Sequence, residues 1–268
     1  MQVISSKDNE IVKHVKKLSE KKYRDQMQEY LIEGIKLIEE AIQEKAVISK
    51  IIICEECTKN LEISKNLMYE IAKHECIYVT EKIFKNLSQV TNPQGILAII
   101  KKEPEKLKIE YNDDIIVALD DIQDPGNLGT ILRTVDSVGL NQIIVTKGTA
   151  DVYNPKVVRS TMGAIFRVKV IEVENLEESI KTMQKKGFKL MVTSLQTDKT
   201  IYDVEYDKKI IVIGNEANGV SQDIQKLANE RVIIPMLGKT ESLNASVATG
   251  IILYEYVRNK IKQINIIK

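Results

Sequence analysis

The chain has little of the chemistry that many enzymes use, with no tryptophan, three cysteines and two histidines among its 268 residues. The odd number of cysteines argues against a framework of disulfide bonds. His14 lies among lysines in a predicted N-terminal helix and His74 near two cysteines, and neither neighbourhood supplies a nucleophile. We therefore expect any catalysis by this chain to proceed without an imidazole.

The cysteines raise the question of a zinc site. Cys54 and Cys57 form a CxxC pair, and His74 and Cys76 follow, so four ligands could be drawn. However, only one residue separates His74 from Cys76, and no glycine follows the CxxC pair to turn a knuckle. This spacing fits the usual zinc pattern poorly. The favoured interpretation is that Cys54 ends a buried strand, and we predict no metal site.

Long hydrophobic runs and an excess of charge are also missing. No apolar run approaches the roughly 18–20 residues of a membrane span, and the polar N-terminus MQVISSKDNE lacks the apolar core of a signal peptide. We therefore expect a cytoplasmic protein without a membrane partner. Lys plus Arg (39) nearly balance Asp plus Glu (38), so a nucleic-acid partner would need a local basic patch.

The hydrophobic content, 43%, is enough for a sizeable core and for two domains. Residues 1 to about 100 are predicted to form a small α/β domain. Within it, EYLIEGIKLIEEAIQE (29–44) predicts a helix that places Leu31, Ile35, Ile38 and Ile42 on one face. Further predicted elements are strands at 47–53 and 95–100 and helices at 60–75 and 81–88. The charged segment KKEPEKLKIEYNDD (101–114) contains Pro104 and is the predicted linker.

From Ile115 onward, apolar strands alternate with helices. The strands are expected at 115–119, 142–146, 189–193, 209–214 and 231–235, and the helices at 128–138, 155–163, 176–186, 222–229 and 243–261. Strands that are apolar throughout are typical of a parallel sheet covered on both faces. The sequence thus predicts an α/β fold whose ligand crevice lies at the carboxyl ends of the strands.

Three loops at those ends carry small polar residues and glycines. They are DDIQDPGNLGTILRT after the first strand, NEANGVS after the fourth and MLGKTESLNASVATG after the fifth. Each loop leads into a helix, and helix N-termini offer free amides. One interpretation is a set of capped helices; the other is a pocket built from helix ends. The phosphate-binding GK[ST] and the dinucleotide fingerprint GxGxxG are both absent.

The same loops resemble the three motifs of the SpoU/TrmH class of SPOUT RNA 2′-O-ribose methyltransferases. The matching stretches are DPGNLGTILRT, IGNEANGVS and IPMLGKTESLNASVA, and NPKVVRSTMGAIFR resembles the segment between the first two. EYLIEGIKLIEEAI and TNPQGILAII resemble the ribosomal-protein-L30-like substrate-binding domain of many members. The resemblance covers nearly the whole chain. Its small departures, Ala217 for Gly and Ala245 for Val, remove no functional side chain.

The resemblance implies an N-terminal L30-like α/β/α domain (1–100), a linker (101–114) and a C-terminal SPOUT α/β catalytic domain (115–268) with a deep trefoil knot. It implies a homodimer that binds S-adenosyl-methionine and RNA. The implied cofactor-binding residues are Gly214, Ile234, Met236 and Leu243, and the implied active-site residues are Asn127, Arg133, Glu216, Ser242 and Asn244. The capped-helix interpretation and the pocket interpretation of Asn244 can hold together.

The family role of Arg133 is to activate the ribose 2′-hydroxyl. Because a guanidinium is essentially never deprotonated, we expect Arg133 to grip the adjacent phosphate and stabilise the developing alkoxide, while a phosphate oxygen or water takes the proton. Asn127 and Asn244 are expected to orient the ribose or Arg133. Glu216 has two open interpretations: it holds a motif loop, or it pairs with Arg133.

A basic cluster near the start of the chain is a candidate RNA surface, although such clusters are often merely solvated faces; it consists of Lys13, Lys16, Lys17, Lys21, Lys22 and Arg24. We predict RNA contacts at Lys21, Lys22, Arg24, Lys156 and Arg159. Since no aromatic residues of the kind used for base stacking were found among them, recognition by shape and phosphate is expected. The favoured substrate is 23S rRNA. The alternatives are tRNA, or a catalytically silent rRNA-binding assembly factor; the missing GxGxxG disfavours a nucleotide-dependent dehydrogenase.

Overall fold

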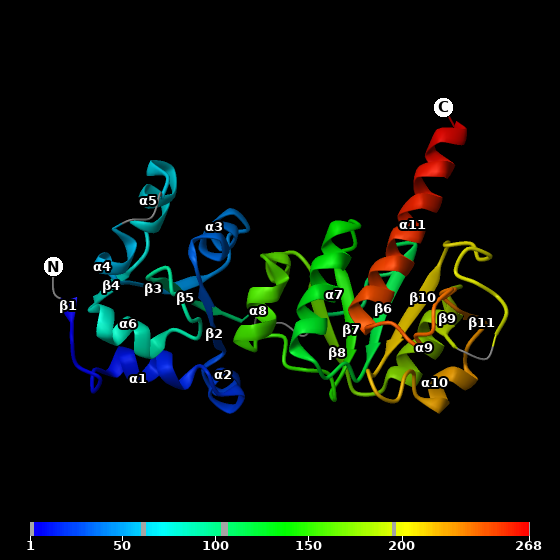
Figure 1. Cartoon of the computed structure of the whole chain (residues 1–268), viewed down its shortest axis with the longest axis horizontal. Coiled ribbons are helices and arrows are strands. Elements are labelled where there is room, and N and C mark those ends of the chain that lie inside the picture. The colour runs from blue at the N-terminus through cyan, green and yellow to red at the C-terminus, as the bar shows by residue number, and fades with distance from the viewer. Residues whose placement is uncertain (1–2, 60–62, 103–106, 195–196, 268) are drawn as a thin grey trace. The chain divides into compact units, whose positions relative to one another are not determined.

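The computed structural model describes residues 3–59, 63–102, 107–194 and 197–267. It divides into two compact units, each with its own sheet (Figure 1). The first unit comprises Met1–Glu105 and Tyr153–Phe166, and the second comprises Lys106–Val152 and Arg167–Lys268. The segment Tyr153–Phe166 therefore packs with the N-terminal part of the chain, although it lies between two strands of the second sheet.

The first unit contains a mixed sheet of five strands in the order β1-β4-β3-β5-β2. The strands are β1 (Val3–Ile4), β2 (Glu29–Glu33), β3 (Ile48–Ile53), β4 (Cys76–Val79) and β5 (Ile96–Lys101). β1, β4 and β3 run parallel, whereas β5 runs antiparallel to both β3 and β2. Successive side chains of β5 point to opposite faces: Leu97 and Ile99 enter one core, and Ile96 and Ala98 enter the other.

Helices cover both faces of this sheet. α1 (Glu10–Lys17) and α6 (Glu81–Leu87) pack on one face, and α3 (Ile35–Gln43), α5 (Lys65–Ile71) and α8 (Pro155–Thr161) pack on the other. The short helices α2 (Lys21–Met27) and α4 (Glu55–Thr58) complete the unit. The helix predicted at 60–75 forms over the shorter range Lys65–Ile71. Residues 60–62 of the prediction lie outside the described residues.

The helix predicted over residues 29–44 is wrong in its first half. Glu29–Glu33 forms strand β2, which pairs with β5, and the helix begins after Gly34. Gly34 has φ of 103°, a conformation that L side chains rarely adopt, and it separates the two elements. The short apolar run Tyr30–Ile32 fits either a strand or a helix by its pattern alone, so pairing with β5 decides its structure.

The second unit contains a parallel sheet of six strands in the order β11-β9-β10-β6-β7-β8. The strands are β6 (Ile115–Asp120), β7 (Gln142–Thr146), β8 (Lys169–Val173), β9 (Lys189–Thr193), β10 (Lys209–Gly214) and β11 (Glu230–Val232). The predicted parallel α/β sheet is confirmed. The sequence patterns missed β8, and β11 ends three residues earlier than predicted.

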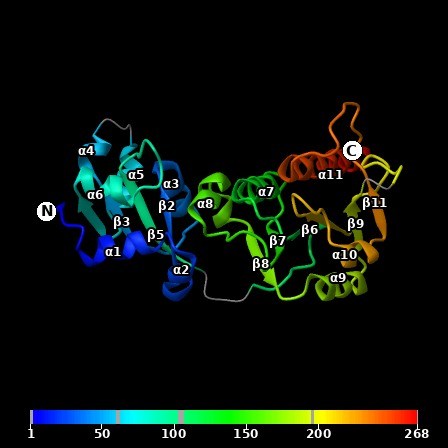
Figure 2. The same ribbon diagram turned by 60° about the horizontal axis from the view of Figure 1, so that its bottom comes forward.

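Helices cover both faces of the second sheet (Figure 2). α7 (Pro125–Ser137) and α11 (Ala245–Ile267) lie side by side on one face. α9 (Leu176–Lys185) and α10 (Gln222–Lys226) pack on the other face, where Ile180 and Ile224 join Ile116 and Val212 in the core. A short 3-10 turn, Ala164–Phe166, follows α8 in the first unit. Over the described part of the chain, no helix combines the length and apolar character that crossing a membrane requires.

The strand order of the second unit reverses between β6 and β10, and we refer to the sheet edge at this switch point as the crevice. After β6 the chain runs outward through β7 and β8, whereas β10, β9 and β11 lie on the other side of β6. The loops that leave the neighbouring strands β6 and β10 therefore turn in opposite directions at the same sheet edge. Open parallel sheets bind ligands at such a switch point, beyond the carboxyl ends of the strands.

The second half of the predicted linker has contacts of its own. Ile109 and Tyr111 pack against the core of the second unit. The main chain of Glu110 exchanges two hydrogen bonds with the Gln142 side chain, from Glu110 N to Oε1 (2.9 Å) and from Nε2 to Glu110 O (2.7 Å). Residues 103–106 of this segment lie outside the described residues.

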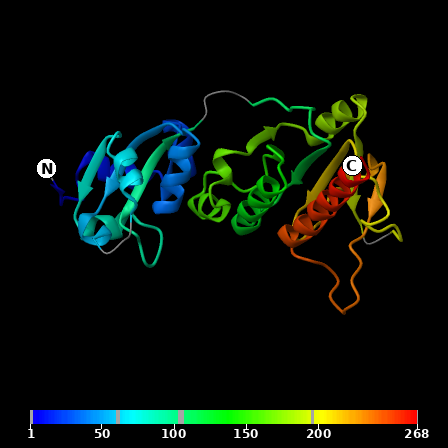
Figure 3. The same ribbon diagram turned by 90° about the horizontal axis from the view of Figure 1, so that it is seen from above.

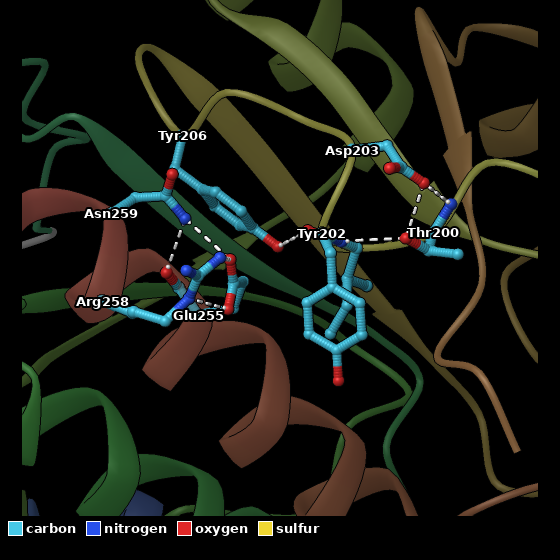
Figure 4. A network of polar contacts seen from close by, with 8 residues as sticks. Thr200, Tyr202, Asp203, Tyr206, Glu255, Arg258 and Asn259 are labelled. Atoms are coloured by element: carbon cyan, nitrogen blue, oxygen red, sulfur yellow. Dashed lines mark hydrogen bonds and ion pairs between the residues drawn. The ribbon is translucent and has the colours of Figure 1, made fainter. Parts of the chain in front are cut away.

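Two sets of polar contacts lie close together, one on α11 and one in the crossover between β9 and β10 (Figure 4). Glu255, a buried carboxylate on α11, pairs with Arg258 and accepts a hydrogen bond from Asn259 Nδ2 (2.9 Å). Its neighbour Tyr206 is buried and donates to the carbonyl of Ile201 (2.9 Å). The Arg258 hydrogen bond holds the pKa of Glu255 below its ordinary value against the opposing effect of burial.

Candidate active site

The first loop of the crevice is fixed by a capped helix start. Asp124 caps α7 by accepting a hydrogen bond from the Asn127 amide at 2.8 Å, and Pro125 occupies the first turn, where no amide is needed. This start aims the Asn127 side chain into the crevice, where it is 7% exposed. Its Nδ2 donates to Glu216 Oε1 at 2.9 Å.

Glu216, in the loop after β10, joins that loop to the first one. Besides Asn127, the main-chain amides of Gln123 and Asp124 donate to its two carboxylate oxygens, each at 3.2 Å. Burial acts to raise the pKa of Glu216, but the hydrogen bonds from Asn127 and from main-chain amides outweigh it and hold that pKa below its ordinary value. The carboxylate is therefore ionised and serves as an acceptor for three donors of the neighbouring loop.

Gly214 and Asn215 shape the same loop. A Cβ on Gly214 would lie 2.1 Å from the main chain of Gly219 and Val220, so the loop closes tightly over this position. Asn215 and Gly219 exchange two main-chain hydrogen bonds (3.0 and 2.8 Å) across the turn. The Asn215 side chain donates to the carbonyl of Asp121 at 2.8 Å, which adds a second link between the two loops.

The third loop joins the network through Asn244. Its Oδ1 accepts from the amides of Ser246 (2.9 Å) and Val247 (3.3 Å), which caps α11. Its Nδ2 donates to Asn127 Oδ1 at 2.9 Å. Because an ionised Glu216 can only accept, the amide of Asn127 must turn its Nδ2 to Glu216 and its Oδ1 to Asn244. Asn244 thus caps a helix and belongs to the crevice.

The segment between β11 and α11 presents apolar side chains and free main-chain groups. It extends away from the sheet (Figure 3). Ile234 and Met236 are half-buried, Leu243 is 36% exposed, and Leu237 is fully exposed. Among the described residues, no main-chain amide from 234 to 243 makes a hydrogen bond. Apolar side chains beside unused amides and carbonyls fit an adenine ring and its polar edge, so this segment fits S-adenosyl-methionine.

Arg133 and Ser242 lie outside the hydrogen-bond network. Arg133 is exposed on the face of α7 that also carries Thr130 and Ser137, and within the described residues it has no hydrogen-bond or ion-pair partner. Ser242 is likewise exposed and makes no hydrogen bond to any described residue. Three of the five expected active-site residues are therefore brought together, and the other two face outward.

The expected RNA contacts fall into two groups, and both groups are in the first unit. Lys21 and Lys22 are exposed at the start of α2; Lys156 is exposed and Arg159 half-buried on α8. Arg24 is a correction: it is 2% exposed, and its Nη1 donates to the carbonyls of Leu18 (2.8 Å) and Ser19 (2.7 Å). A guanidinium that closes the turn between α1 and α2 in this way is not available to RNA.

The cysteines do not gather into a metal site. The Sγ atoms of Cys54 and Cys57 lie 2.6 Å apart as free thiols, and Cys54 is fully buried. In the described part of the chain, no three of its His, Cys, Asp or Glu residues form a group suited to a metal ion.

Sequence reasoning missed two residues that organise the crevice, Asp124 and Asn215. A signal for Asp124 was present, because Asp followed by Pro-Gly-Asn is the pattern of an N-cap before a helix that starts with proline. Asn215 carried no such signal, since its link to Asp121 O joins positions that are distant in sequence.

The fold and these joined loops define a class: an α/β protein with a ligand site at the switch point of a parallel sheet. Within that class, the model of the SpoU rRNA Methylase family matches residues 114–254, more than half of the chain. The chain belongs to this family. A second model, the MRM3-like substrate binding domain, matches residues 9–98. The family resemblance expected from the three motifs is confirmed.

Relatives cover almost the whole chain. The 23S rRNA (guanosine(2553)-2'-O)-methyltransferase RlmP of Bacillus subtilis is 31% identical over 255 residues, 95% of this chain and 98% of that protein. A crystal structure of an RNA 2'-O ribose methyltransferase is 27% identical with a TM-score of 0.84, covering 97% of this chain and 100% of that one. An AdoMet-bound rRNA methyltransferase from Sinorhizobium meliloti is 28% identical with a TM-score of 0.82, covering 96% and 97%. This chain is thus an enzyme of the RNA 2′-O-ribose methyltransferase family.

Proposed function

We propose that this enzyme transfers the methyl group of S-adenosyl-methionine to a ribose 2′-hydroxyl of 23S rRNA. The observation that carries the proposal is the chain of contacts Asn244–Asn127–Glu216, which joins three loops at the switch point of the parallel sheet. It unites the three motifs of the family in one crevice. The 23S rRNA activity of the Bacillus subtilis relative supports the choice of substrate.

The proposed cofactor-binding residues lie in two places, at the end of β10 and in the third loop. Gly214, Ile234, Met236 and Leu243 would hold S-adenosyl-methionine with apolar surface and main-chain groups. When bound, this cofactor supplies a methyl group on a sulfonium, which leaves as a neutral thioether. The loop after β10 contributes shape: its tight closure at Gly214 leaves no room for a side chain there.

Arg133 is the residue that we assign to the ribose. Its guanidinium is free of partners among the described residues and stands on the exposed face of α7. It would bind the phosphate next to the target ribose and stabilise charge on the 2′-oxygen as the proton leaves to a phosphate oxygen or water. Ser242, exposed at the same helix end as Asn244, would contact the ribose.

Glu216 has a supporting role in this proposal. All its hydrogen bonds come from the first loop, at Gln123, Asp124 and Asn127. These contacts support the loop-holding interpretation over a pair with Arg133. Through Asn127 and Asn244, these hydrogen bonds would also hold the start of α11 in place. The residues that contact the ribose and the cofactor would then keep their relative positions.

A homodimer with a knotted catalytic domain is part of the proposal. α11 carries Val247, Tyr254 and Ile261 at intervals of two helical turns, and each is about half exposed (49%, 55% and 52%). An apolar stripe of this kind supports burial against a second copy. Arg133 on the neighbouring helix α7 would then lie near the partner. Residues 1–100 would form the substrate-binding domain, 101–114 the linker and 115–268 the knotted catalytic domain of a cytoplasmic enzyme.

The test is methyl transfer from labelled S-adenosyl-methionine to total rRNA and, separately, to total tRNA from cells that lack this protein. Label in 23S rRNA is the expected result. Label in tRNA alone would replace the substrate and keep the chemistry. Cofactor binding without label in either RNA would call for ribosomal particles as substrate. Absence of cofactor binding would overturn the proposal in favour of a silent rRNA-binding assembly factor.

A further inference from the structure

A basic pocket in the first unit lies between α1, α2 and β3, outside the candidate active site, and two lysines of the N-terminal basic cluster line it. Its volume is about 350 Å³, which is the range of small-ligand sites. The residues that matter to its chemistry are Glu10, Lys13, His14, Lys17, Tyr23 and Lys50. Lys13, His14 and Lys17 share one face of α1, because they are spaced three and four residues apart.

The wall of this pocket is held rigid by His14. Its Nε2 lies 2.8 Å from Glu29 Oε2, and its Nδ1 lies 3.0 Å from the Tyr23 hydroxyl. The other oxygen of Glu29 accepts from Ser49 Oγ at 2.8 Å. In this geometry the carboxylate of Glu29 accepts from Nε2 of His14 and from the Ser49 hydroxyl. The imidazole thereby fixes the position of Tyr23, whose ring meets it edge-on at 5.6 Å between centroids.

Three ammonium groups line the pocket, and they differ in how far they are neutralised. Lys50 pairs with Glu75, and Lys13 pairs at 3.4 Å with Glu10, which is 90% exposed. Lys17 has no carboxylate partner within the described residues; its ammonium lies 5.6 Å from the centre of the Tyr23 ring. Exposed pairs such as Lys13–Glu10 are weak, so the pocket offers at least two cations to an anion.

We propose that this pocket binds one unpaired nucleotide of the RNA substrate, with the phosphate on Lys13 and Lys17 and the base on the ring of Tyr23. A cation beside a fixed aromatic ring is the combination that binds single-stranded nucleic acid, because the cation binds the phosphate and the ring stacks on the face of any base. Tyr23 therefore corrects the expectation that the basic cluster has no aromatic residue for stacking. The proposal rests on RNA being the substrate, as proposed above.

The decisive experiment measures binding of the full-length protein to a labelled oligouridine and to a base-paired RNA hairpin, over a series of salt concentrations. Each phosphate contact to a single strand contributes about −0.7 to the slope of log affinity against log salt. Because the two lysines share one phosphate, the double variant Lys13→Gln/Lys17→Gln should make the slope for oligouridine shallower by about 0.7. The matched control, Lys65→Gln/Lys82→Gln, removes the same charge from exposed positions outside the pocket and should leave the slope unchanged.

Two variants of Tyr23 separate the ring from its hydroxyl. Tyr23→Leu removes the stacking face and should weaken oligouridine binding about tenfold, while binding to the hairpin stays the same. Tyr23→Phe keeps the ring and its edge contact with His14 but loses the hydroxyl contact, so it should weaken oligouridine binding less than Tyr23→Leu does. Equal slopes for the two double variants, or unchanged oligouridine binding by Tyr23→Leu, would overturn the pocket. Failure of methyl transfer with intact oligouridine binding would instead overturn the proposed activity.

Discussion

The two sheets of this protein place their polar residues in opposite ways. All six strands of the second sheet run parallel, so their carboxyl ends and the loops that follow share one edge. The first sheet is mixed: β5 alone runs antiparallel to its neighbours β3 and β2, so its carboxyl end lies at the opposite edge from those of the other four strands. The polar cluster of the first unit is built mainly on helices α1 and α2 instead of on loops at a sheet edge.

This difference has a consequence for how each region responds to mutation. The crevice depends on contacts between residues about 90 to 120 positions apart, such as Asn127 with Glu216 and with Asn244. The pocket of the first unit depends on side chains of two adjacent helices, with Lys50 as its distant member. Changes in the crevice should therefore alter loops and chemistry together, whereas changes at the pocket surface should alter RNA binding alone.

The largest effect is expected for Arg133→Ala, which removes the one free cation that we assign to the reaction. Loss of a group that stabilises charge in the transition state typically lowers kcat by about 10²–10³. Because Arg133 touches none of the loops in the network, cofactor affinity and Tm should stay as in the wild type. Single-turnover methyl transfer and calorimetric cofactor binding measure the two quantities. Activity near the wild-type rate would exclude this role.

A smaller but broader effect is expected for Asn127→Ala, which removes the central residue of the Asn244–Asn127–Glu216 chain of contacts. It removes partners from Glu216 and Asn244 at once; because both residues are exposed, each lost hydrogen bond costs about 0.5–1.5 kcal/mol. We expect the free energy of unfolding to fall by the sum of the two costs and cofactor binding to weaken with it. Urea denaturation and cofactor titration test the prediction. Thr130→Ala, on the exposed face of the same helix, is the matched control.

In the first unit, Arg24→Gln separates structure from recognition. The side chain bridges the carbonyls of Leu18 and Ser19 in a buried turn, so its loss should destabilise the protein by about 1–3 kcal/mol. The salt dependence of RNA binding should not change. The comparison variant Lys21→Gln/Lys22→Gln should do the reverse, with an unchanged Tm and a shallower salt slope. A changed slope for Arg24→Gln at full stability would restore its predicted RNA contact.

The smallest effect is expected for Glu255→Gln, which weakens the contacts among Glu255, Arg258 and Asn259 on α11. The pKa of Glu255 in the folded protein lies below its ordinary value of 4.5. A lowered folded-state pKa stabilises the fold above the unfolded-state pKa, and the gain is lost as the pH falls through the folded value.

The Tm difference between wild type and Glu255→Gln should therefore be small, about 2 °C at neutral pH since Arg258 is half exposed. It should shrink as the pH falls below 4.5 and through the folded-state pKa of Glu255. Thermal melts of both proteins between acidic and neutral pH measure it. A difference that is the same at every pH would mean that the charge of Glu255 is not what stabilises the contact.

Much of the second unit followed from the sequence because its strands are short, apolar and separated by turn residues. The strands β6, β7, β9 and β10 lie within one residue of their predicted positions. β8 was missed because KVIEV mixes charge with apolar residues at the edge of the sheet. In the first unit, the pattern of residues 29–44 suits a helix by periodicity, and pairing with β5 overrides it for the first five residues.

The sequence by itself determined the alternation of strands and helices, the polar loops at the carboxyl ends and the three family motifs, because these are local patterns of residue type. Tertiary structure alone decided which polar groups meet. It joined Asn127 to Glu216 and Asn244, turned Arg24 inward, left Arg133 free and set Tyr23 among the lysines of α1. The physical reason is that hydrogen bonds act over about 3 Å in space, and no local pattern records which distant segments the packing of a sheet will bring within that distance.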